Sequence, residues 1–239
     1  MSQSYWLING IAGVDPEDAS LGSAAWARWV VDGDLVQEID ARGMPADWRY
    51  GRIVAPAEKP NWMPAKPIDR AAWQLNEKLV QWAFELTRNV VLDDTPEMQK
   101  LRARYTGNAA RPPFVLLGDD IGSSTWWHGK LLNEWSNDWA RLWTHNQANA
   151  VMTDREDNGI AVALERLAKL TRANFDRVLF LRTASNYAAQ APGQSAGESV
   201  HAPMVGMVPA LEACWRVGSP VVRALATGQN PSSLDKVSY

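Results

Sequence analysis

Short apolar segments alternate with segments of helical periodicity along this chain, and this alternation restricts the fold more than any other feature. The apolar segments are rich in β-branched and aromatic residues, which is typical of strands; they are Tyr5–Asn9, Trp26–Val36, Phe114–Leu117, Ala150–Met152 and Arg177–Leu181. Strands separated by helices predict an α/β fold, here a three-layer α/β/α sandwich with a mixed, largely parallel central sheet. No linker or repeat interrupts the pattern, so we expect residues 1–239 to form a single domain.

The segments between the strands carry helix signals. Asp69 is expected to cap a helix whose apolar positions step by three and four, at Ala72, Leu75, Leu79, Ala83 and Leu86. Thr95 is expected to cap a shorter helix with Pro96 in its first turn. Trp135, Trp139 and Trp143 repeat every four residues, which predicts a helix with these rings packed in the core.

The charge balance and the single cysteine exclude several classes of protein. The chain has 24 Lys and Arg against 27 Asp and Glu, a net charge of −3, which does not fit a basic nucleic-acid-binding surface. Cys214 is the only cysteine, which excludes an internal disulfide and a multi-cysteine metal site. No segment approaches the roughly 20 apolar residues of a membrane span. We expect a soluble protein, cytoplasmic from the chain as written and periplasmic or otherwise extracytoplasmic if a signal segment precedes it.

The polar segments that follow the strands are the places to look for a site, because ligands of such sheets bind at the carboxyl ends of strands. These segments are the glycine turn of Asn9–Pro16, the loop Gly118–Gly129, the segment Thr153–Gly159 and the loop Arg182–Gly197. The third contains three carboxylates at the start of a helix, Asp154, Glu156 and Asp157. They either cap the helix or accept hydrogen bonds from a polyol such as a sugar, and the residues alone leave both interpretations open.

Two motifs in these segments suggest other chemistry. Gly193–Gly197 fits the G-x-S-x-G pattern around Ser195, but a serine-hydrolase elbow needs a strand directly before it and Pro192 stands there instead. The segment from Asp154 to Glu165 partly fits a calcium loop, with a glutamate where a shorter residue is required. The three histidines lack metal-ligand spacing. We expect no metal site, and the serine hydrolase stays a minor alternative.

Five segments, taken in order, resemble the purine nucleoside permease family. They are YWLINGIAGVDP, VVDGDLVQEIDAR, TWWHG, MTDREDNG and LRTASNYAAQAPGQSA. That family resembles the nucleoside phosphorylase and nucleosidase superfamily, whose members bind a nucleoside at the strand ends and break its N-glycosidic bond. The resemblance covers nearly the whole chain and implies a nucleoside phosphorylase-like fold.

The resemblance also assigns candidate site residues. Glu156 matches the glutamate that holds the ribose hydroxyls, and Ser185 and Asn186 match the Ser-Asp pair at the purine. The aromatic loop that stacks on the base matches the segment containing Trp126, Trp127 and His128, and the turn beside phosphate or water matches Gly10 to Gly13. Glu156 and Asn186 are thus the candidate catalytic residues. The implied ligand is a purine nucleoside, with phosphate as a potential co-substrate and no other cofactor.

Three departures from the superfamily pattern qualify this assignment. Asn186 can hydrogen-bond a base nitrogen but cannot deliver a proton as aspartate does. Ile11 stands where phosphorylases tend to place a hydroxyl for phosphate. The usual first strand is expected upstream of Met1, so we expect Tyr5–Asn9 to leave an exposed strand edge.

Two functions follow from the resemblance. The first is cleavage of purine nucleosides by phosphorolysis or hydrolysis, in nucleoside uptake or catabolism. The alternative is a non-catalytic, soluble nucleoside-binding component of nucleoside transport, because the sequence contains no segment that could form a pore. The sequence leaves homo-oligomerisation and the preferred base open.

Overall fold

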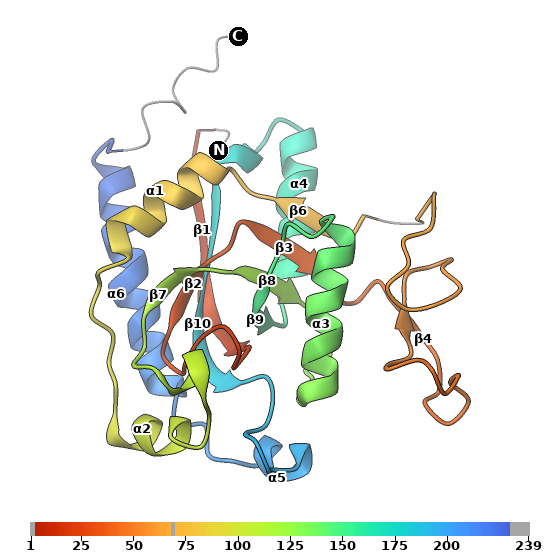
Figure 1. Cartoon of the computed structure of the whole chain (residues 1–239). Helices are drawn as coiled ribbons and strands as arrows, with labels where there is room; N and C mark the ends of the chain where they lie inside the picture. Colours follow the sequence, from red (N-terminus) through yellow and green to blue (C-terminus); the bar gives the residue numbers. More distant parts are fainter. Residues whose placement is uncertain (1–2, 68–69, 230–239) are drawn as a thin grey trace.

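The central element of the protein is one mixed sheet of eight strands in the order β6-β3-β8-β9-β1-β10-β2-β7 (Figure 1). The computed structural model describes residues 3–67 and 70–229. Four of the seven neighbouring strand pairs are parallel and three are antiparallel. The strands are β1 (Trp6–Val14), β2 (Ala24–Trp26), β3 (Trp29–Asp32), β6 (Ala72–Gln74), β7 (Val115–Leu117), β8 (Asp119–Gly122), β9 (Ala150–Asp154) and β10 (Val178–Tyr187), while β4 (Gln37–Glu38) and β5 (Arg52–Ile53) form a separate pair.

Helices cover the sheet and bury its apolar side chains. The helices are α1 (Glu77–Thr87), α2 (Pro96–Arg102), α3 (Lys130–Trp143), α4 (Asp157–Lys169), α5 (Ala196–Val200) and α6 (Met207–Ala226), with short 3-10 turns at Gly107–Ala110 and Phe175–Arg177. Helix α6 packs against β1, β10 and β2, α1 against β2 and β7, α4 against β8 and β3, and α3 against β9. The predicted α/β fold with a largely parallel central sheet is confirmed. None of the described helices has the length and apolar character needed to cross a membrane.

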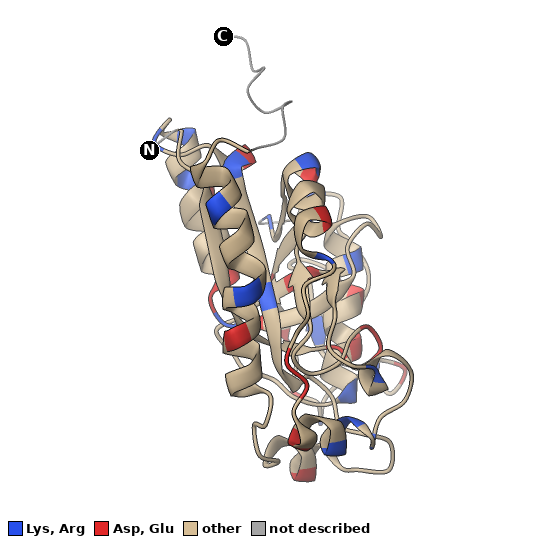
Figure 2. Cartoon of the chain, turned by 90° about the vertical axis from the view of Figure 1, so that its left-hand side faces the viewer, with Lys and Arg blue, Asp and Glu red and all other residues tan. Residues whose placement is uncertain are grey.

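Figure 2 shows acidic and basic residues spread over several helices and loops. The core is mainly apolar, and the buried polar residues include several Ser, Thr, Asn and Asp side chains and Arg182. Trp135 and Trp139 are buried on α3, as their four-residue spacing predicts, and Trp143 is half-buried and packs against the same core cluster.

The helix predicted from Asp69 begins later than expected. Asp69 lies outside the described residues, and Ala72–Gln74 form β6 because they pair with β3. Helix α1 starts at Glu77, where the side chain of Asn76 accepts hydrogen bonds from the first-turn amides of Lys78 and Leu79. The predicted Thr95 cap of α2 is confirmed by a hydrogen bond from the Met98 amide.

Three segments predicted as turns or loops are strands. Gly10–Gly13 continues β1, Asp119–Gly122 is β8, and Arg182–Tyr187 is the second half of β10. Their polar and glycine-rich composition suggested loops, but each segment pairs with neighbouring strands that satisfy its backbone groups. The candidate site residues of β1 and β10 are therefore held by a rigid sheet.

The expectation of an exposed edge at the first strand concerns β1. This strand is internal in the sheet order and pairs with β10 from Trp6 to Val14. Its pairing with β9, on the other side, involves only Gly13 and Val14. Within the described residues, the stretch from Trp6 to Ala12 is thus paired along one edge, as predicted, although the strand lies in the middle of the sheet.

Candidate functional site

The site is built on the parallel pair β1 and β10. Gly10 lies opposite Arg182 and Gly13 lies opposite Asn186, and the register shifts between Ala12 and Gly13. A side chain at Gly10 would collide with the Arg182 guanidinium and would lie 3.7 Å from Glu156 Oε1. Glycine is required there because it lets a charged group from β10 cross over the neighbouring strand.

Arg182 is the centre of a buried charge cluster. Its side chain is 2% exposed and contacts three acids that surround the start of α4. Nε donates to Asp157 Oδ2 at 2.8 Å and Nη2 donates to Asp157 Oδ1, while Nη1 donates to Glu156 Oε1 at 2.8 Å. Nη1 also donates to the carbonyl of Ile11 at 3.2 Å. One guanidinium thereby joins β10, β1 and the start of α4.

The acids of the cluster have strongly different proton affinities. Burial, together with Asp154 and Asp157, raises the pKa of Asp120 well above its ordinary value. Burial also raises the pKa of Asp157 to about 7, although Arg182 opposes the shift. For Asp154, burial is outweighed by a hydrogen bond from Asp120 and by Arg182, and the pKa is lowered. Asp120 therefore holds its proton more tightly than an exposed acid does, and the neighbouring Asp154 gives up its proton more readily.

Glu156 presents one face of its carboxylate to solvent and the other to Arg182. Its side chain is 54% exposed, and its backbone amide donates to Asp154 Oδ1 at 2.7 Å. The arginine contact fixes the carboxylate beside Gly10 and leaves acceptor sites free. An ionised carboxylate in this position can accept hydrogen bonds from two adjacent hydroxyls.

Ser185 and Asn186 lie at the other end of the same strand pair. Ser185 is 2% exposed, and its Oγ lies 3.0 Å from the Ala12 carbonyl and 2.9 Å from Asn186 Oδ1. Asn186 is half-buried, and its Nδ2 lies 3.2 Å from where a Cβ of Gly13 would be. Gly10 and Gly13 both belong to β1, and the fold places Glu156 next to the first and Asn186 next to the second.

The loop between β8 and α3 carries the three aromatic candidates. Trp126 is 47% exposed, and its ring stacks on the His128 imidazole with centroids 5.8 Å apart. Burial lowers the pKa of His128, so the imidazole is neutral at pH 7. Trp127 is 5% exposed and packs edge-on against Trp135 in the core. Of the two tryptophans, Trp126 is the one that a ligand can reach.

Hydrogen bonds join this aromatic loop to both ends of the strand pair. Arg155 Nε donates to the Ser124 carbonyl at 3.2 Å, beside Glu156, and the Gly129 amide donates to the Ala188 carbonyl at 2.9 Å, just after β10. Asp34 accepts from the Ser123 hydroxyl at 2.6 Å. The loop therefore spans from the Glu156 region to the region of Asn186.

Sequence reasoning missed the residue that holds Glu156 in place. Arg182 was only part of a loop, and the three carboxylates were considered without it, although an arginine directly after the apolar run VLFL signals a buried ion pair. Among the described residues, the carboxylates of Asp120, Asp154 and Asp157 lie close enough to hold a cation. Arg182 already supplies the positive charge there. Ser195 is the N-cap of α5, where it forms a capping box with Glu198.

A family of known proteins matches this chain along nearly its whole length. The model of the purine nucleoside permease (NUP) family matches residues 1–232. The chain belongs to this family.

Two purine nucleoside permeases resemble the chain along most of its length. One, from Candida albicans, is 29% identical over 228 residues, which cover 93% of this chain and 56% of the relative. A probable purine nucleoside permease of Schizosaccharomyces pombe is 29% identical over 196 residues, or 78% of this chain and 56% of the relative. This permease-family chain therefore spans little more than half the length of these relatives.

Solved structures share the fold at low sequence identity. Futalosine hydrolase of Helicobacter pylori superposes with a TM-score of 0.50 at 15% identity, covering 91% of this chain and 66% of that one. The 5′-methylthioadenosine/S-adenosylhomocysteine nucleosidase of the same organism also gives 0.50 at 15% identity, with 91% and 67% covered. The permease-family chain thus has the fold of these nucleosidases.

Proposed function

We propose that this chain binds a purine nucleoside along Gly10–Gly13 of β1 and cleaves its N-glycosidic bond. The observation that carries the proposal is Glu156, a half-exposed carboxylate fixed beside Gly10 by the buried Arg182. In this arrangement Glu156 accepts hydrogen bonds from the ribose hydroxyls, Asn186 hydrogen-bonds the purine and Trp126 stacks on it. The names of the related permeases and the fold of the nucleosidases support a nucleoside as the ligand.

The proposed reaction exchanges one bond at the anomeric carbon. Water or phosphate attacks C1′ as the bond to the purine nitrogen breaks, and the departing purine takes up the proton that the nucleophile releases. The carboxylate of Glu156 stabilises the positive charge that develops on the ribose in the transition state. Hydrolysis fits better than phosphorolysis, because Ile11 is apolar and the guanidinium of Arg182 is occupied by acids.

A second candidate function is binding without cleavage, as a component of nucleoside uptake. The observation that favours it is Asn186, which cannot protonate the leaving purine. Its side-chain oxygen accepts from Ser185 and its amide nitrogen donates to the Tyr187 carbonyl at 3.2 Å, which leaves the second N–H of the amide for a ligand. An enzyme with this residue would depend on Glu156 and on hydrogen bonding alone, so its turnover would be slow.

The test is incubation of the purified chain with inosine and with adenosine, with and without phosphate, followed by chromatography of the free base. Release without phosphate identifies a nucleosidase, and release only with phosphate identifies a phosphorylase. Equilibrium dialysis with labelled nucleoside then separates a binder that retains intact nucleoside from a protein with no nucleoside site. If the chain neither releases free base nor binds nucleoside, the proposal is wrong.

Matched variants locate the site. Glu156→Gln and Trp126→Ala are each expected to weaken nucleoside binding about tenfold or more, because each removes one charge-assisted or stacking contact. Glu97→Gln and Trp62→Ala remove the same groups from exposed positions elsewhere and are expected to change nothing. If the two control variants weaken nucleoside binding as much as Glu156→Gln and Trp126→Ala do, the nucleoside binds elsewhere.

A further inference from the structure

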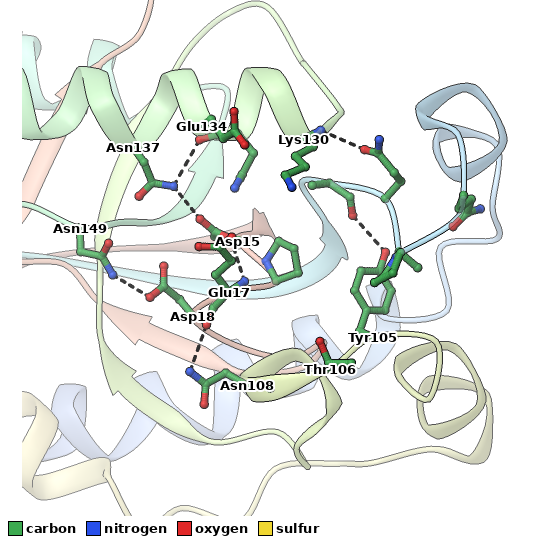
Figure 3. A pocket seen from close by; sticks show the side chains of 18 of the residues that line it. Asp15, Glu17, Asp18, Tyr105, Thr106, Asn108, Lys130, Glu134, Asn137 and Asn149 are labelled. Atoms are coloured by element: carbon green, nitrogen blue, oxygen red, sulfur yellow. Dashed lines mark hydrogen bonds between the residues drawn. The ribbon is translucent and has the colours of Figure 1, made fainter. Parts of the chain in front are cut away.

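A cavity opens beside the turn that follows β1. Its volume is about 840 Å³, and none of the residues predicted to contact the nucleoside lines it. Its walls are the turn after β1, the polar face of α3, the segment 105–108 and the segment after β10 (Figure 3). Four segments far apart in the sequence thus enclose a space with no assigned occupant.

Two acids of the turn after β1 are held in the wall by neutral donors. Asp15 is 1% exposed, and its Oδ2 accepts from Asn137 Nδ2 at 2.6 Å. Asp18 Oδ1 accepts from Asn149 Nδ2 at 2.8 Å, and Figure 3 shows both contacts. An amide donor orients a carboxylate but carries no compensating charge. Both carboxyl groups therefore line the same cavity without a cation bonded to them.

Among the described residues, none of the cations that line the cavity forms an ion pair with Asp15 or Asp18. Arg49 pairs with Glu134, and Arg141 lies 3.7 Å from Asp138. Lys130 is exposed, and its ammonium makes no ion pair within the described part of the chain. The lining contains five carboxylates, which are Asp15, Glu17, Asp18, Glu134 and Asp138, and three cations, which are Arg49, Lys130 and Arg141. The excess charge is negative and is concentrated on the turn after β1.

A side chain on α3 gives a second, independent indication that the cavity holds a ligand. Asn133 lines the cavity and is only 6% exposed, yet its Oδ1 has no hydrogen-bond partner among the described residues. A buried amide without partners is costly, and such groups normally bond to protein, water or a ligand. Asn133 lies one helical turn before Asn137, on the face of α3 that lines the cavity.

We propose that this cavity binds an organic cation with several N–H donors, of the alkyl polyamine class. Ammonium groups would pair with Asp15 and Asp18 on the turn after β1 and donate to the side-chain amide of Asn133. The flexible chain of a polyamine suits a cavity whose acids come from two elements, the turn and α3. The proposal concerns a separate cavity and does not depend on the nucleoside function.

The proton affinity of Asp18 agrees with this assignment. Burial, with the neighbouring charges of Asp15 and Glu17, raises the pKa of Asp18 to about 6, against the opposing effects of Asn149 and Arg141. A cation bound in the cavity lowers this pKa again. Binding at pH 6 is therefore expected to release protons, whereas binding at pH 8 releases few.

The test is isothermal titration calorimetry of the full chain with spermidine at an ionic strength of about 0.15 M, where long-range attraction is screened. Asp18→Asn and Glu17→Gln are expected to weaken binding severalfold to tenfold. Asp47→Asn removes an equal charge from an exposed position outside the cavity and is expected to change nothing. Repeating the titration at pH 6 in two buffers of different ionisation enthalpy measures the released protons.

The Lys130→Gln variant tests whether the ligand of the cavity is a cation. This variant removes a repelling cation from the lining and is expected to tighten spermidine binding. Trp126→Ala is expected to leave the affinity for spermidine unchanged, because Trp126 does not line the cavity. Absence of spermidine binding, weaker binding in Lys130→Gln, or equal weakening in Asp47→Asn would overturn the proposal.

Discussion

Arg182 shows how one buried side chain organises the candidate site. It emerges from the second half of β10, crosses β1 at Gly10 and holds Glu156 and Asp157 at the start of α4. The contact with this arginine orients the Glu156 carboxylate. The sequence indicated Glu156 directly, whereas Arg182 matters only because the fold brings three acids around it.

Loss of the arginine is therefore expected to be costly. Arg182→Met would leave Asp154 and Asp157 buried without their cation, and breaking a buried ion pair in this way costs roughly 3–5 kcal/mol of unfolding free energy. Urea denaturation measures the loss. Arg42→Met removes an arginine whose side chain is 91% exposed and should change stability by less than about 0.5 kcal/mol. A similarly small loss for Arg182→Met would show that the cluster does not stabilise the fold.

Among the strands, β1 is paired on both sides at its carboxyl end and on one side along the rest of its length. Its last two residues pair on both sides, but the stretch from Trp6 to Ala12 pairs only with β10 in the described structure. The side chains of this stretch are mostly half-buried, and Asn9 is exposed. Glu156 and Arg182 lie against the middle of this half-paired strand.

Hydrogen exchange should report this difference directly. In a strand paired on one side, alternate amides lack partners, so about every second amide between Leu7 and Ala12 should exchange fast. Amides of Leu181–Thr183 in β10, which is flanked by β1 and β2, should exchange slowly. Amide exchange followed by NMR on the full chain gives both rates. Uniform slow exchange across Trp6–Ala12 would mean that a further strand covers this edge in solution.

Across the whole molecule, several buried acids have raised pKa values. The pKa of Asp120 is raised well above its ordinary value, that of Asp157 is raised to about 7 and that of Asp18 to about 6, in each case mainly by burial. Such groups bind protons more tightly in the folded chain than in the unfolded chain. The unfolding free energy therefore falls as pH rises from about 4 toward 7.

We accordingly expect a lower melting temperature at pH 7.5 than at pH 5.5, by about 3 °C or more. Asp120→Asn mimics the neutral acid and keeps a donor for Asp154, so it should flatten this dependence. Asp176→Asn, at an exposed position, should leave it unchanged. Thermal unfolding followed by circular dichroism at both pH values measures the difference. A melting temperature that rises with pH would show that the buried acids are ionised in the folded state.

The sequence by itself determined the α/β class, the helices over Thr95–Arg102 and Lys130–Trp143, and the strand segments around Tyr5–Asn9 and Arg177–Leu181. Apolar periodicity and caps are local signals, and these elements obey them. Only the tertiary structure decided that the polar stretches at Gly10–Gly13, Asp119–Gly122 and Arg182–Tyr187 are strands. There the backbone partners come from distant parts of the chain, so pairing outweighs local composition. For the same reason the Arg182 cluster and the acidic cavity, whose members are separated by up to about 170 residues, exist only in the folded molecule.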